Sequence, residues 1–251
     1  MNVRAVIFDV YKTLLAVGPG PADSERRWAD LARSTCGTPP RLSLAEFTAA
    51  TAAVIAREHA TARAAGINWP EIFWPDVVSA VLPEVDALPP AVRETFLFRQ
   101  KALAHTVGLM PGAAGVLGRL RDRGVPLGIA SNAQPYTLLE LARELAPAGL
   151  GLADFAPDLS FWSFAHGFSK PDPHVFRLLT ARLRARGIAA SDTLMVGDRT
   201  DNDIEPARAQ GWRVWRLGPA GADGGSGDWT ALGAFLDAEP SGSALVGADG
   251  R

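Results

Sequence analysis

The first apolar run of the chain is short, uninterrupted and ends on a carboxylate. Residues Ala5 to Phe8 carry no polar side chain, and Asp9 follows them directly. Such a continuous run is typical of a strand buried on both faces in a parallel sheet. Ligands of open α/β sheets bind at the carboxyl ends of strands, where a carboxylate can act as a covalent nucleophile. The pattern therefore predicts a central strand with Asp9 at a reactive position.

From Met110 onward, short apolar runs alternate with stretches of helical periodicity. Strands are predicted over residues 125–130, 159–164, 193–196 and 212–217. Helices are predicted over residues 113–123, 135–145, 173–186, 204–210 and 229–236. Such alternation is typical of a parallel sheet with right-handed crossover connections, so the expected fold class is α/β.

Between residues 22 and 105 the pattern is helical, and we find no convincing strand there. Helices are predicted over residues 24–34, 43–65, 70–81 and 90–105, the second opening with a Ser43/Glu46 capping box. This block follows the first strand, so we expect an inserted α-helical domain that covers the strand ends. The expected organisation is a core of residues 1–16 and 106–237 containing a loop at 220–228, a helical insertion of residues 17–105, and a flexible tail of residues 238–251.

Polar groups follow four of the predicted strands. They are Asp9, the pair Ser131-Asn132, Lys170 and the acidic segment from Gly197 to Asp203. The carboxyl ends of parallel strands share one crevice, so we expect these side chains to converge. A carboxylate nucleophile, a hydroxyl, a cation and a second acidic cluster suit attack on an anionic substrate. Carboxylates and substrate oxygens would hold Mg²⁺ there.

Composition narrows the class of protein but does not identify a substrate. The chain has 251 residues, 47% hydrophobic and 21% charged, which is ordinary for a globular protein. A net charge of −2 gives no attraction for nucleic acid or an anionic membrane, and the single cysteine, Cys36, excludes an intramolecular disulfide. No apolar run approaches the roughly 20 residues that span a bilayer, and the first strand leaves no room for a signal peptide. We therefore expect a cytoplasmic protein without nucleic-acid or membrane partners; the composition does not indicate an oligomeric state.

The four polar clusters, in this order, resemble the four motifs of the haloacid dehalogenase superfamily. The similarity runs from Arg4 to about Leu236, and the insertion resembles the helical C1 cap of that superfamily. The resemblance implies a Rossmann-like core, a covalent intermediate on Asp9 and a small anionic substrate.

The same resemblance implies roles for individual residues. Candidate catalytic residues are Asp9, Tyr11, Lys12, Thr13 and Lys170; candidate substrate-binding residues are Ser131, Asn132 and Lys170; candidate Mg²⁺ ligands are Asp9, the backbone carbonyl of Tyr11, Asp198 and Asp203. Asp201 is better explained as a cap of the following helix than as a ligand. Trp69, Phe73 and Trp74 of the insertion either line the substrate pocket or form the core of the insertion, and the second is favoured.

The first motif departs from the phosphatase pattern. Phosphatases of this superfamily usually carry Asp two residues after the nucleophile, as the acid for the leaving alcohol, and this chain has Tyr11. Tyr is typical of the 2-haloacid dehalogenase branch, whose halide leaving group needs no proton. Lys12 stands where Gly is usual, and either a solvated turn lysine or a proton donor is consistent with it. Arg26 and Arg27 do not form a recognisable halide cradle.

The fourth motif, Gly197-Asp198, is phosphatase-like, whereas related dehalogenases generally have Ser-Ser-Asn there. A carboxylate retained to hold a divalent cation is useful against a dianionic phosphate and has no evident task with a monoanionic haloacid. The sequence therefore favours Mg²⁺-supported cleavage of a small phosphorylated metabolite with weakened general acid catalysis. The alternatives are a metal-independent 2-haloacid dehalogenase and a non-catalytic anion-binding protein.

Overall fold

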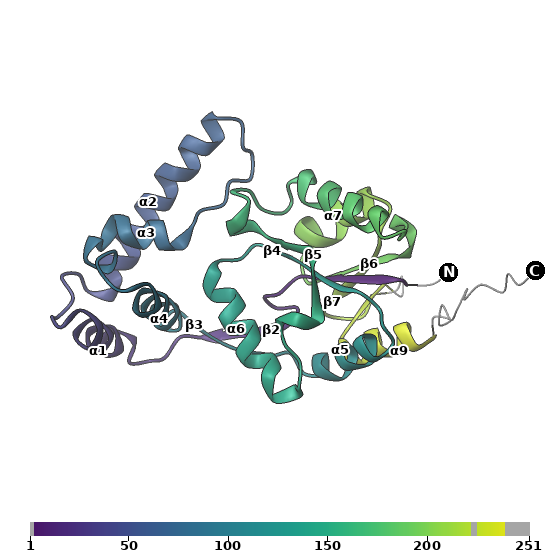
Figure 1. Ribbon diagram of the computed structural model, residues 1–251, viewed down its shortest axis with the longest axis horizontal. Helices are drawn as coiled ribbons and strands as arrows, with labels where there is room; N and C mark the ends of the chain where they lie inside the picture. Colours follow the sequence, from purple (N-terminus) through teal and green to yellow (C-terminus); the bar gives the residue numbers. More distant parts are fainter. Residues whose placement is uncertain (1–2, 222–224, 239–251) are drawn as a thin grey trace, which may run out of the picture.

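The computed structural model describes residues 3–221 and 225–238. Its strands are β1 (Ala5–Phe8), β2 (Leu15–Pro19), β3 (His105–Leu109), β4 (Leu127–Ser131), β5 (Phe155–Trp162), β6 (Thr193–Gly197), β7 (Arg213–Leu217) and β8 (Ser226–Gly227). Its α-helices are α1 (Ser24–Cys36), α2 (Leu44–Ala64), α3 (Trp74–Val81), α4 (Pro90–Lys101), α5 (Ala113–Asp122), α6 (Pro135–Leu145), α7 (Pro173–Ala185), α8 (Glu205–Ala209) and α9 (Trp229–Ala238). Helices α1 to α4 lie to one side of the large sheet and its covering helices (Figure 1). The predicted tail lies, from residue 239 onward, outside the described residues.

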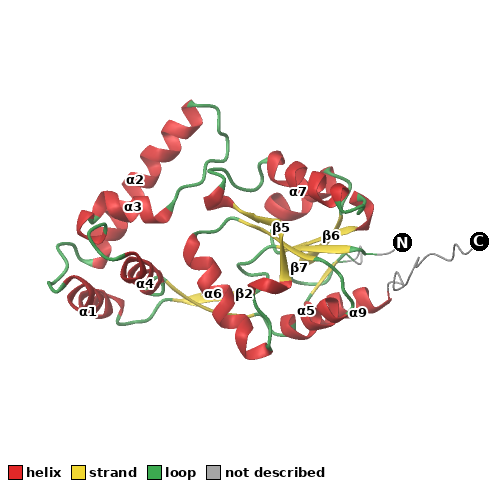
Figure 2. Ribbon diagram, in the orientation of Figure 1, coloured by secondary structure: helices red, strands yellow, loops and turns green. Residues whose placement is uncertain are grey.

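Six strands form one parallel sheet in the order β5-β4-β1-β6-β7-β8. Helices, red in Figure 2, lie on both sides of its yellow strands. Alternate residues of β1 reach opposite faces of this sheet. Val6 and Phe8 pack in an apolar cluster with α5, α6 and α9, whereas Ala5 and Ile7 pack in a second cluster with α7 and α8. Burial on both faces explains the uninterrupted apolar run of β1. The predicted α/β fold with a Rossmann-like parallel sheet is confirmed.

Helices α1 to α4 and the segments that join them, called the cap from here on, have an apolar core of their own. The ring centroid of Trp28 lies 5.0 Å from that of Phe47 and 6.0 Å from that of Phe96. Trp74 is buried in the same cluster, edge-on to Phe47, as the favoured interpretation predicted. Trp69 and Phe73 are exposed by 40% and 41%, so they do not belong to this buried core. The predicted inserted α-helical cap is therefore present.

A two-stranded antiparallel ribbon carries the chain between the sheet and the cap. β2 pairs with β3 in a register that sets Leu15 opposite Leu109 and Pro19 opposite His105. Neither strand was predicted from the sequence, and the last cap helix was predicted to extend to His105. That prediction is wrong, because α4 ends at Lys101 and His105 already belongs to β3. The predicted limits of the insertion, residues 17 and 105, fall inside this ribbon.

Two further boundaries differ from the predictions. Residues 70–73 were predicted as helical, but α3 begins at Trp74, with Pro75 in its first turn. The preceding segment is extended: Pro70 forms a bridge with Phe168, and the backbone N–H of Glu71 donates to the Gly167 carbonyl at 3.0 Å. Residues 70–73 therefore link the cap to the loop after β5. The second difference lies in the predicted loop 220–228, where Ser226–Gly227 forms the short edge strand β8.

No helix in residues 3–221 and 225–238 combines the length and the apolar character required to cross a bilayer.

Candidate functional site

Three carboxylates meet at the carboxyl ends of β1 and β6. Asp9 follows β1, Asp198 follows β6, and Asp203 lies in the short π-helical turn Thr200–Ile204. Each contributes an oxygen, and these oxygens all lie within 4.8 Å of one another. Asp9 and Asp203 are buried, whereas Asp198 is partly exposed. The convergence expected from the strand ends is therefore found for all three acids.

Lys170 supplies the positive charge of this cluster. Its Nζ donates to Oδ1 of Asp9 at 2.8 Å and to Oδ1 of Asp203 at 2.5 Å, and its side chain is 2% exposed. Asn132 fixes the backbone of Lys170 from both sides: its Nδ2 donates to the Lys170 carbonyl at 2.9 Å, and its Oδ1 accepts from the Lys170 N–H at 2.8 Å. Asn132 was predicted to bind substrate, and this geometry gives its amide the task of positioning Lys170.

Burial and charge compete in setting the proton affinities of these groups. Burial raises the pKa of Asp9 to about 6, against the lowering effect of Lys170, and the neighbouring Asp203 raises it further. Burial also raises the pKa of Asp198, and again Asp203 adds to the effect. For Lys170, burial lowers the pKa, but Asp9 and Asp203 outweigh it and the net shift is upward. The lysine is therefore charged, and it stabilises the two buried carboxylates beside it.

Asp203 is held from a second direction by the backbone of the turn that carries it. Its Oδ2 accepts from the Arg199 N–H at 3.0 Å while its Oδ1 binds Lys170. Gly197, the last residue of β6, lies directly against this carboxylate: a Cβ at that position would stand 2.4 Å from Oδ2 of Asp203. Asp201, in contrast, forms an exposed ion pair with Arg199 and lies outside the cluster. The Gly of the fourth motif is thus explained by a close approach.

Two buried hydroxyls, one in the turn after β1 and one at the end of β4, have no hydrogen-bond partner among the described residues. They are Oγ1 of Thr13 and Oγ of Ser131. Leaving a buried polar group unpaired costs about 1–3 kcal/mol, so such groups are expected where a ligand supplies the partner. Both residues belong to the predicted motifs, Thr13 four residues after the nucleophile and Ser131 at the end of β4. Together with Lys170 they provide the donors that an anionic oxygen requires.

The donor set also fits a divalent cation. Mg²⁺ prefers oxygen ligands and is held in proteins by one or two carboxylates completed by substrate oxygens and water. Asp9 and Asp198 offer such oxygens, and among the described hydrogen bonds Oδ2 of Asp9 is not occupied. Both oxygens of Asp203 already accept hydrogen bonds, which suits a supporting role for this residue.

Tyr11 points away from the carboxylates toward α6. Its hydroxyl donates to Oε2 of Glu140 at 2.6 Å and lies 2.9 Å from Oγ1 of Thr137. The other oxygen of Glu140 lies 3.0 Å from Nε2 of His105, whose ring packs edge-on against that of Tyr11. Burial raises the pKa of the Tyr11 hydroxyl, and the charge of Glu140 raises it further. A tyrosine held in this way is a poor proton donor.

Lys12 adopts the left-handed backbone conformation, with φ of 59°. This conformation costs little for Gly and more for a lysine, which explains why Gly is usual at this position. The side chain is exposed, and its charge is one of the influences that lower the pKa of Asp198. Lys12 is therefore a solvated turn residue whose charge reaches the edge of the acidic cluster.

The structure adds residues that the sequence analysis missed, chiefly Glu140. A carboxylate between Thr137 and Leu141 on the buried face of α6 departs from the apolar pattern of that face, and this departure can be recognised in the sequence. The partners of Glu140 cannot be recognised there, because Tyr11 and His105 are 129 and 35 residues away along the chain. Arg26 and Arg27 pair with Asp23 on the surface of α1, so they form no halide cradle.

Comparison with known proteins identifies a family of hydrolases. Residues 3–211 match the family model of the haloacid dehalogenase-like hydrolases. A phosphoserine phosphatase of Thermus thermophilus is 34% identical over 150 residues, which cover 59% of this chain and 55% of that protein. A phosphoglycolate phosphatase of Rhodospirillum rubrum is 39% identical over 101 residues, covering 40% and 38%. The aligned region thus spans about half, or less, of the length of these curated relatives.

Solved structures share the fold at low sequence identity. A 2-haloacid dehalogenase from Pseudomonas syringae matches with a TM-score of 0.58 at 21% identity, covering 94% of this chain and 98% of that one. A HAD phosphatase from Thermococcus onnurineus matches with a TM-score of 0.54 at 22% identity, covering 95% and 99%. Both branches of the superfamily therefore have this architecture. On the match to the family model, over most of its length, the chain belongs to the haloacid dehalogenase-like hydrolases.

Proposed function

We propose that the protein is a Mg²⁺-dependent phosphatase that cleaves a small phosphorylated metabolite through an aspartyl intermediate on Asp9. The observation that carries the proposal is the cluster of Asp9, Asp198 and Asp203 at the strand ends. Three carboxylates around one lysine leave a net negative charge, which would repel a phosphate unless a divalent cation balanced it. The sequence relatives, named as phosphatases of small metabolites, support the same assignment.

Each residue of the site has a distinct role in the proposed reaction. An oxygen of Asp9 attacks phosphorus, and the bond from phosphorus to the ester oxygen breaks, which leaves the alcohol as its alkoxide and the phosphoryl group on Asp9. Lys170 and the hydroxyls of Ser131 and Thr13 stabilise the charge on the non-bridging phosphoryl oxygens. Water then attacks the same phosphorus, the bond to Asp9 breaks, and inorganic phosphate leaves. A bound Mg²⁺ would offset the negative charge of carboxylates and phosphate, with Asp9, Asp198 and the Tyr11 carbonyl as ligands and Asp203 in support.

The position of Tyr11 predicts a preference among substrates. A positioned general acid is worth roughly 10²–10⁴-fold, and Tyr11 cannot supply it while its hydroxyl is bound to Glu140. Leaving groups that need no proton should therefore be cleaved best. We expect acetyl phosphate and p-nitrophenyl phosphate to be better substrates, in kcat, than simple alkyl phosphates.

A substrate panel tests the proposal. Phosphate esters, acetyl phosphate and 2-chloropropionate are incubated with the protein in Mg²⁺ or in EDTA, and phosphate and chloride release are measured. The expected result is phosphate release that EDTA abolishes and Mg²⁺ restores. The Asp9→Asn variant, which keeps the size of the side chain but lacks the nucleophilic oxygen anion, should lose at least roughly 10⁴-fold in turnover.

One observation favours a second candidate, a 2-haloacid dehalogenase: Tyr11 stands where phosphatases usually have Asp. In that reaction Asp9 displaces the halide from carbon, and water hydrolyses the resulting ester. Chloride release that EDTA leaves unchanged, with no phosphate release, would establish this candidate and reject the phosphatase. Binding of phosphate without turnover of any compound in the panel would instead indicate a non-catalytic anion-binding protein.

A further inference from the structure

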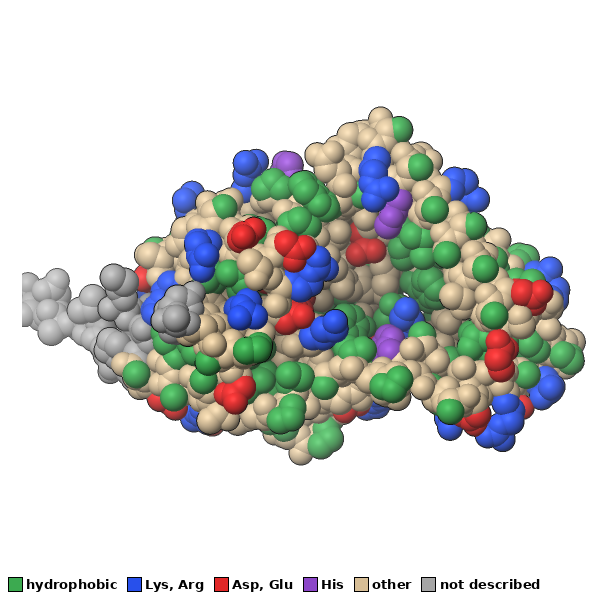
Figure 3. Space-filling view, turned by 180° about the vertical axis from the view of Figure 1, so that it is seen from behind, with side chains coloured by type: hydrophobic (Ala, Val, Ile, Leu, Met, Phe, Trp, Pro, Cys, Tyr) green, Lys and Arg blue, Asp and Glu red, His purple; other side chains and the backbone are tan. Residues whose placement is uncertain are grey.

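A cavity between the cap and the core opens beside the candidate site. Its volume is about 220 Å³, below the roughly 300–1,000 Å³ typical of drug-sized ligands, so it suits a small metabolite. Core residues Tyr11 and Asn132, each next to motif residues in the sequence, form part of its wall. Trp74, Lys101 and Ile55 of the cap form another part. Seen from behind, the molecule is hollowed between its two halves, and hydrophobic side chains gather around the hollow (Figure 3).

Lys101, the last residue of α4, brings a positive charge to this cavity. Its Nζ lies 5.3 Å from the ring centroid of Trp74 and 5.4 Å from that of Tyr136, within cation–π range of both. No carboxylate of the described residues lies within ion-pair distance of it. Burial lowers its pKa, whereas the more distant Glu140 raises it. The lysine is thus partly desolvated and lacks a direct anionic partner.

Glu71, which lines the cavity, and Glu140, whose charge acts on Lys101, both bind protein donors already. Glu140 binds the Tyr11 hydroxyl and His105. Glu71 accepts from Oγ of Ser163 at 2.6 Å and from Nε2 of Gln134 at 3.0 Å, and both donors belong to the core. These bonds direct the carboxylates to protein donors, so Lys101 remains the group that can pair with an incoming anion.

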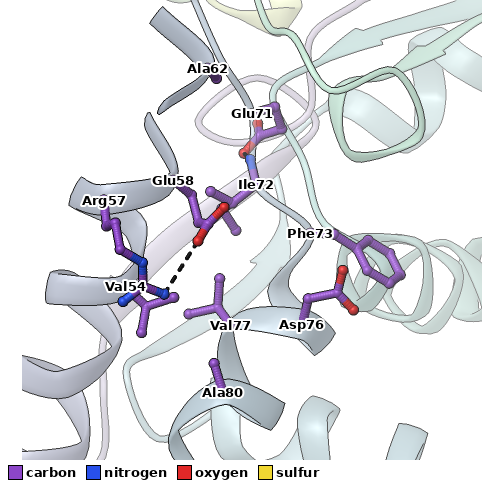
Figure 4. A pocket seen from close by; sticks show the side chains of 10 residues that line it. All are labelled: Val54, Arg57, Glu58, Ala62, Glu71, Ile72, Phe73, Asp76, Val77 and Ala80. Carbon is purple, nitrogen blue, oxygen red and sulfur yellow. Dashed lines mark hydrogen bonds and ion pairs between the residues drawn. The ribbon is translucent and has the colours of Figure 1, made fainter. Parts of the chain in front are cut away.

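A larger cavity in the cap lacks these features. It has a volume of about 330 Å³ and lies between α2, α3 and the extended segment before α3 (Figure 4). Its wall carries the acidic residues Glu58, Glu71 and Asp76, and its one basic residue, Arg57, pairs with Glu58 at 3.3 Å. A net negative wall is unsuited to an anionic substrate. Glu71 lines both cavities, but of the two only the cavity with Lys101 has a cation that no carboxylate of the described residues pairs with, so this cavity is the better suited to an anion.

We propose that Lys101 determines substrate specificity by binding a carboxylate on the non-reacting part of the phosphorylated substrate. The proposal rests on the proposed phosphatase function. One positive charge between two aromatic rings matches a monoanion better than a second phosphate dianion, which needs more donors. The phosphate would lie at Asp9, and a short carbon chain would pass Tyr11 and Asn132 toward the cap. The substrate class is therefore a small phosphorylated carboxylic acid.

The test compares two phosphate esters of equal carbon number. Phosphoglycolate carries a carboxylate, and 2-hydroxyethyl phosphate carries a hydroxymethyl group in its place. Steady-state kinetics are measured for the wild type, for Lys101→Met, which keeps an unbranched apolar stem, and for Lys101→Arg, which keeps the charge. Arg99→Met, on the exposed side of the same helix, is the matched control for loss of a cation.

The proposal predicts that Lys101→Met raises KM for phosphoglycolate by roughly 10- to 100-fold, the effect of losing a charge-assisted contact. It predicts a kcat/KM for 2-hydroxyethyl phosphate within about threefold of the wild type, a partial rescue by Lys101→Arg, and no selective effect of Arg99→Met. An equal loss for both esters, or no loss for either, would overturn the proposal.

Calorimetry separates this inference from the proposed function. Phosphoglycolate is titrated in the presence of Mg²⁺ into the Asp9→Asn variant, in which turnover is blocked, and into the Asp9→Asn/Lys101→Met double variant. If neither ester is turned over but binding depends on Lys101, the phosphatase assignment fails and the carboxylate site stands. If turnover occurs and both proteins bind phosphoglycolate equally, the carboxylate site fails and the phosphatase assignment stands.

Discussion

Two lysines lie near the strand ends, Lys170 buried and Lys101 half-buried, and their surroundings are opposite in kind. Lys170 in the core lies between Asp9 and Asp203 at hydrogen-bonding distance from both. Lys101 in the cap lies between the rings of Trp74 and Tyr136 and has no carboxylate of the described residues at ion-pair distance. Lys170 neutralises carboxylates that are buried in the protein. Lys101 is available to pair with the carboxylate of a bound substrate.

The difference shows how the two halves of the molecule divide their work. A buried ion pair gains little net stability, but losing one partner is costly because the other charge remains buried. The core therefore keeps Lys170, Asp9 and Asp203 together in a fixed geometry suited to catalysis. A cation held only by aromatic faces is less costly to replace, so a cap residue such as Lys101 is free to vary with the substrate.

Replacing each lysine in turn by methionine is the strongest test of this difference. Lys170→Met leaves Asp9 and Asp203 without their cation, so the free energy of unfolding should fall by about 3–5 kcal/mol in EDTA. Phosphate release should fall by roughly 10²–10³-fold, as for the loss of a group that stabilises transition-state charge. Urea denaturation and phosphate release are the measurements. Lys101→Met should leave the free energy of unfolding within about 1 kcal/mol of the wild type, and an equal fall in both variants would contradict the contrast.

The fixed geometry of the core can be disturbed without touching a charge. In Gly197→Ala the new methyl group would overlap Asp203, so we expect a loss of about 1–3 kcal/mol in stability. Displacement of the carboxylate should cost on the order of 10²-fold in turnover. Thermal unfolding and kcat would report these two effects.

Gly118→Ala is the matched control for that substitution. Gly118 lies inside α5 and has no atom within 4 Å of the position that a Cβ would take. The change should therefore raise stability by about 0.5–1 kcal/mol through helix propensity and leave turnover unchanged. If Gly197→Ala behaved like this control, the contact with Asp203 would not constrain the site.

Among the substitutions of motif residues, Tyr11→Phe should have the smallest effect on turnover. Tyr11→Phe removes the hydroxyl that binds Glu140, and the loss of a hydrogen bond to a buried carboxylate should cost about 1.5–3 kcal/mol of stability. Turnover at a temperature where the variant is folded should stay within about threefold, because Tyr11 does not act as the general acid. Loss of a general acid would cost roughly 10²–10⁴-fold. A loss of that larger size in kcat for alkyl phosphates, but not for acetyl phosphate, would identify Tyr11 as the acid after all.

The core half was largely predictable from the sequence, for a physical reason. Parallel strands buried on both faces leave uninterrupted apolar runs, and the rule that ligands bind at the carboxyl ends of strands then places Asp9, Ser131, Lys170 and Asp198 together. The fine geometry was less accessible. Nothing local in the sequence indicates that Asn132 binds the backbone of Lys170 rather than a ligand.

The cap half was predictable as helices but not in its chemistry. The position of Lys101 over Trp74 and Tyr136 depends on how α4 packs against α3 and α6, and no periodicity encodes that packing. The β2–β3 ribbon was missed because β2 contains Gly18 and Pro19, both disfavoured in strands, and because its partner lies about 90 residues away. Contacts between distant segments decide both features.

The ribbon has a consequence for how such a molecule can be rebuilt. Leu15 and Leu109 are paired neighbours, and the Met110 N–H donates to the Leu14 carbonyl at 2.8 Å, so the chain leaves the core and returns to it at one place. The entropic cost of closing an inserted segment grows only slowly with its length, by about 0.6 kcal/mol for each doubling, so segments of different lengths can be held by the same pair of ends. We therefore expect that a short turn, or a cap from a different relative, can be grafted between Leu15 and Leu109. The sheet and the carboxylates at its strand ends should keep their positions. We expect the cap to be exchangeable as a unit, with the β2–β3 ribbon as its point of attachment.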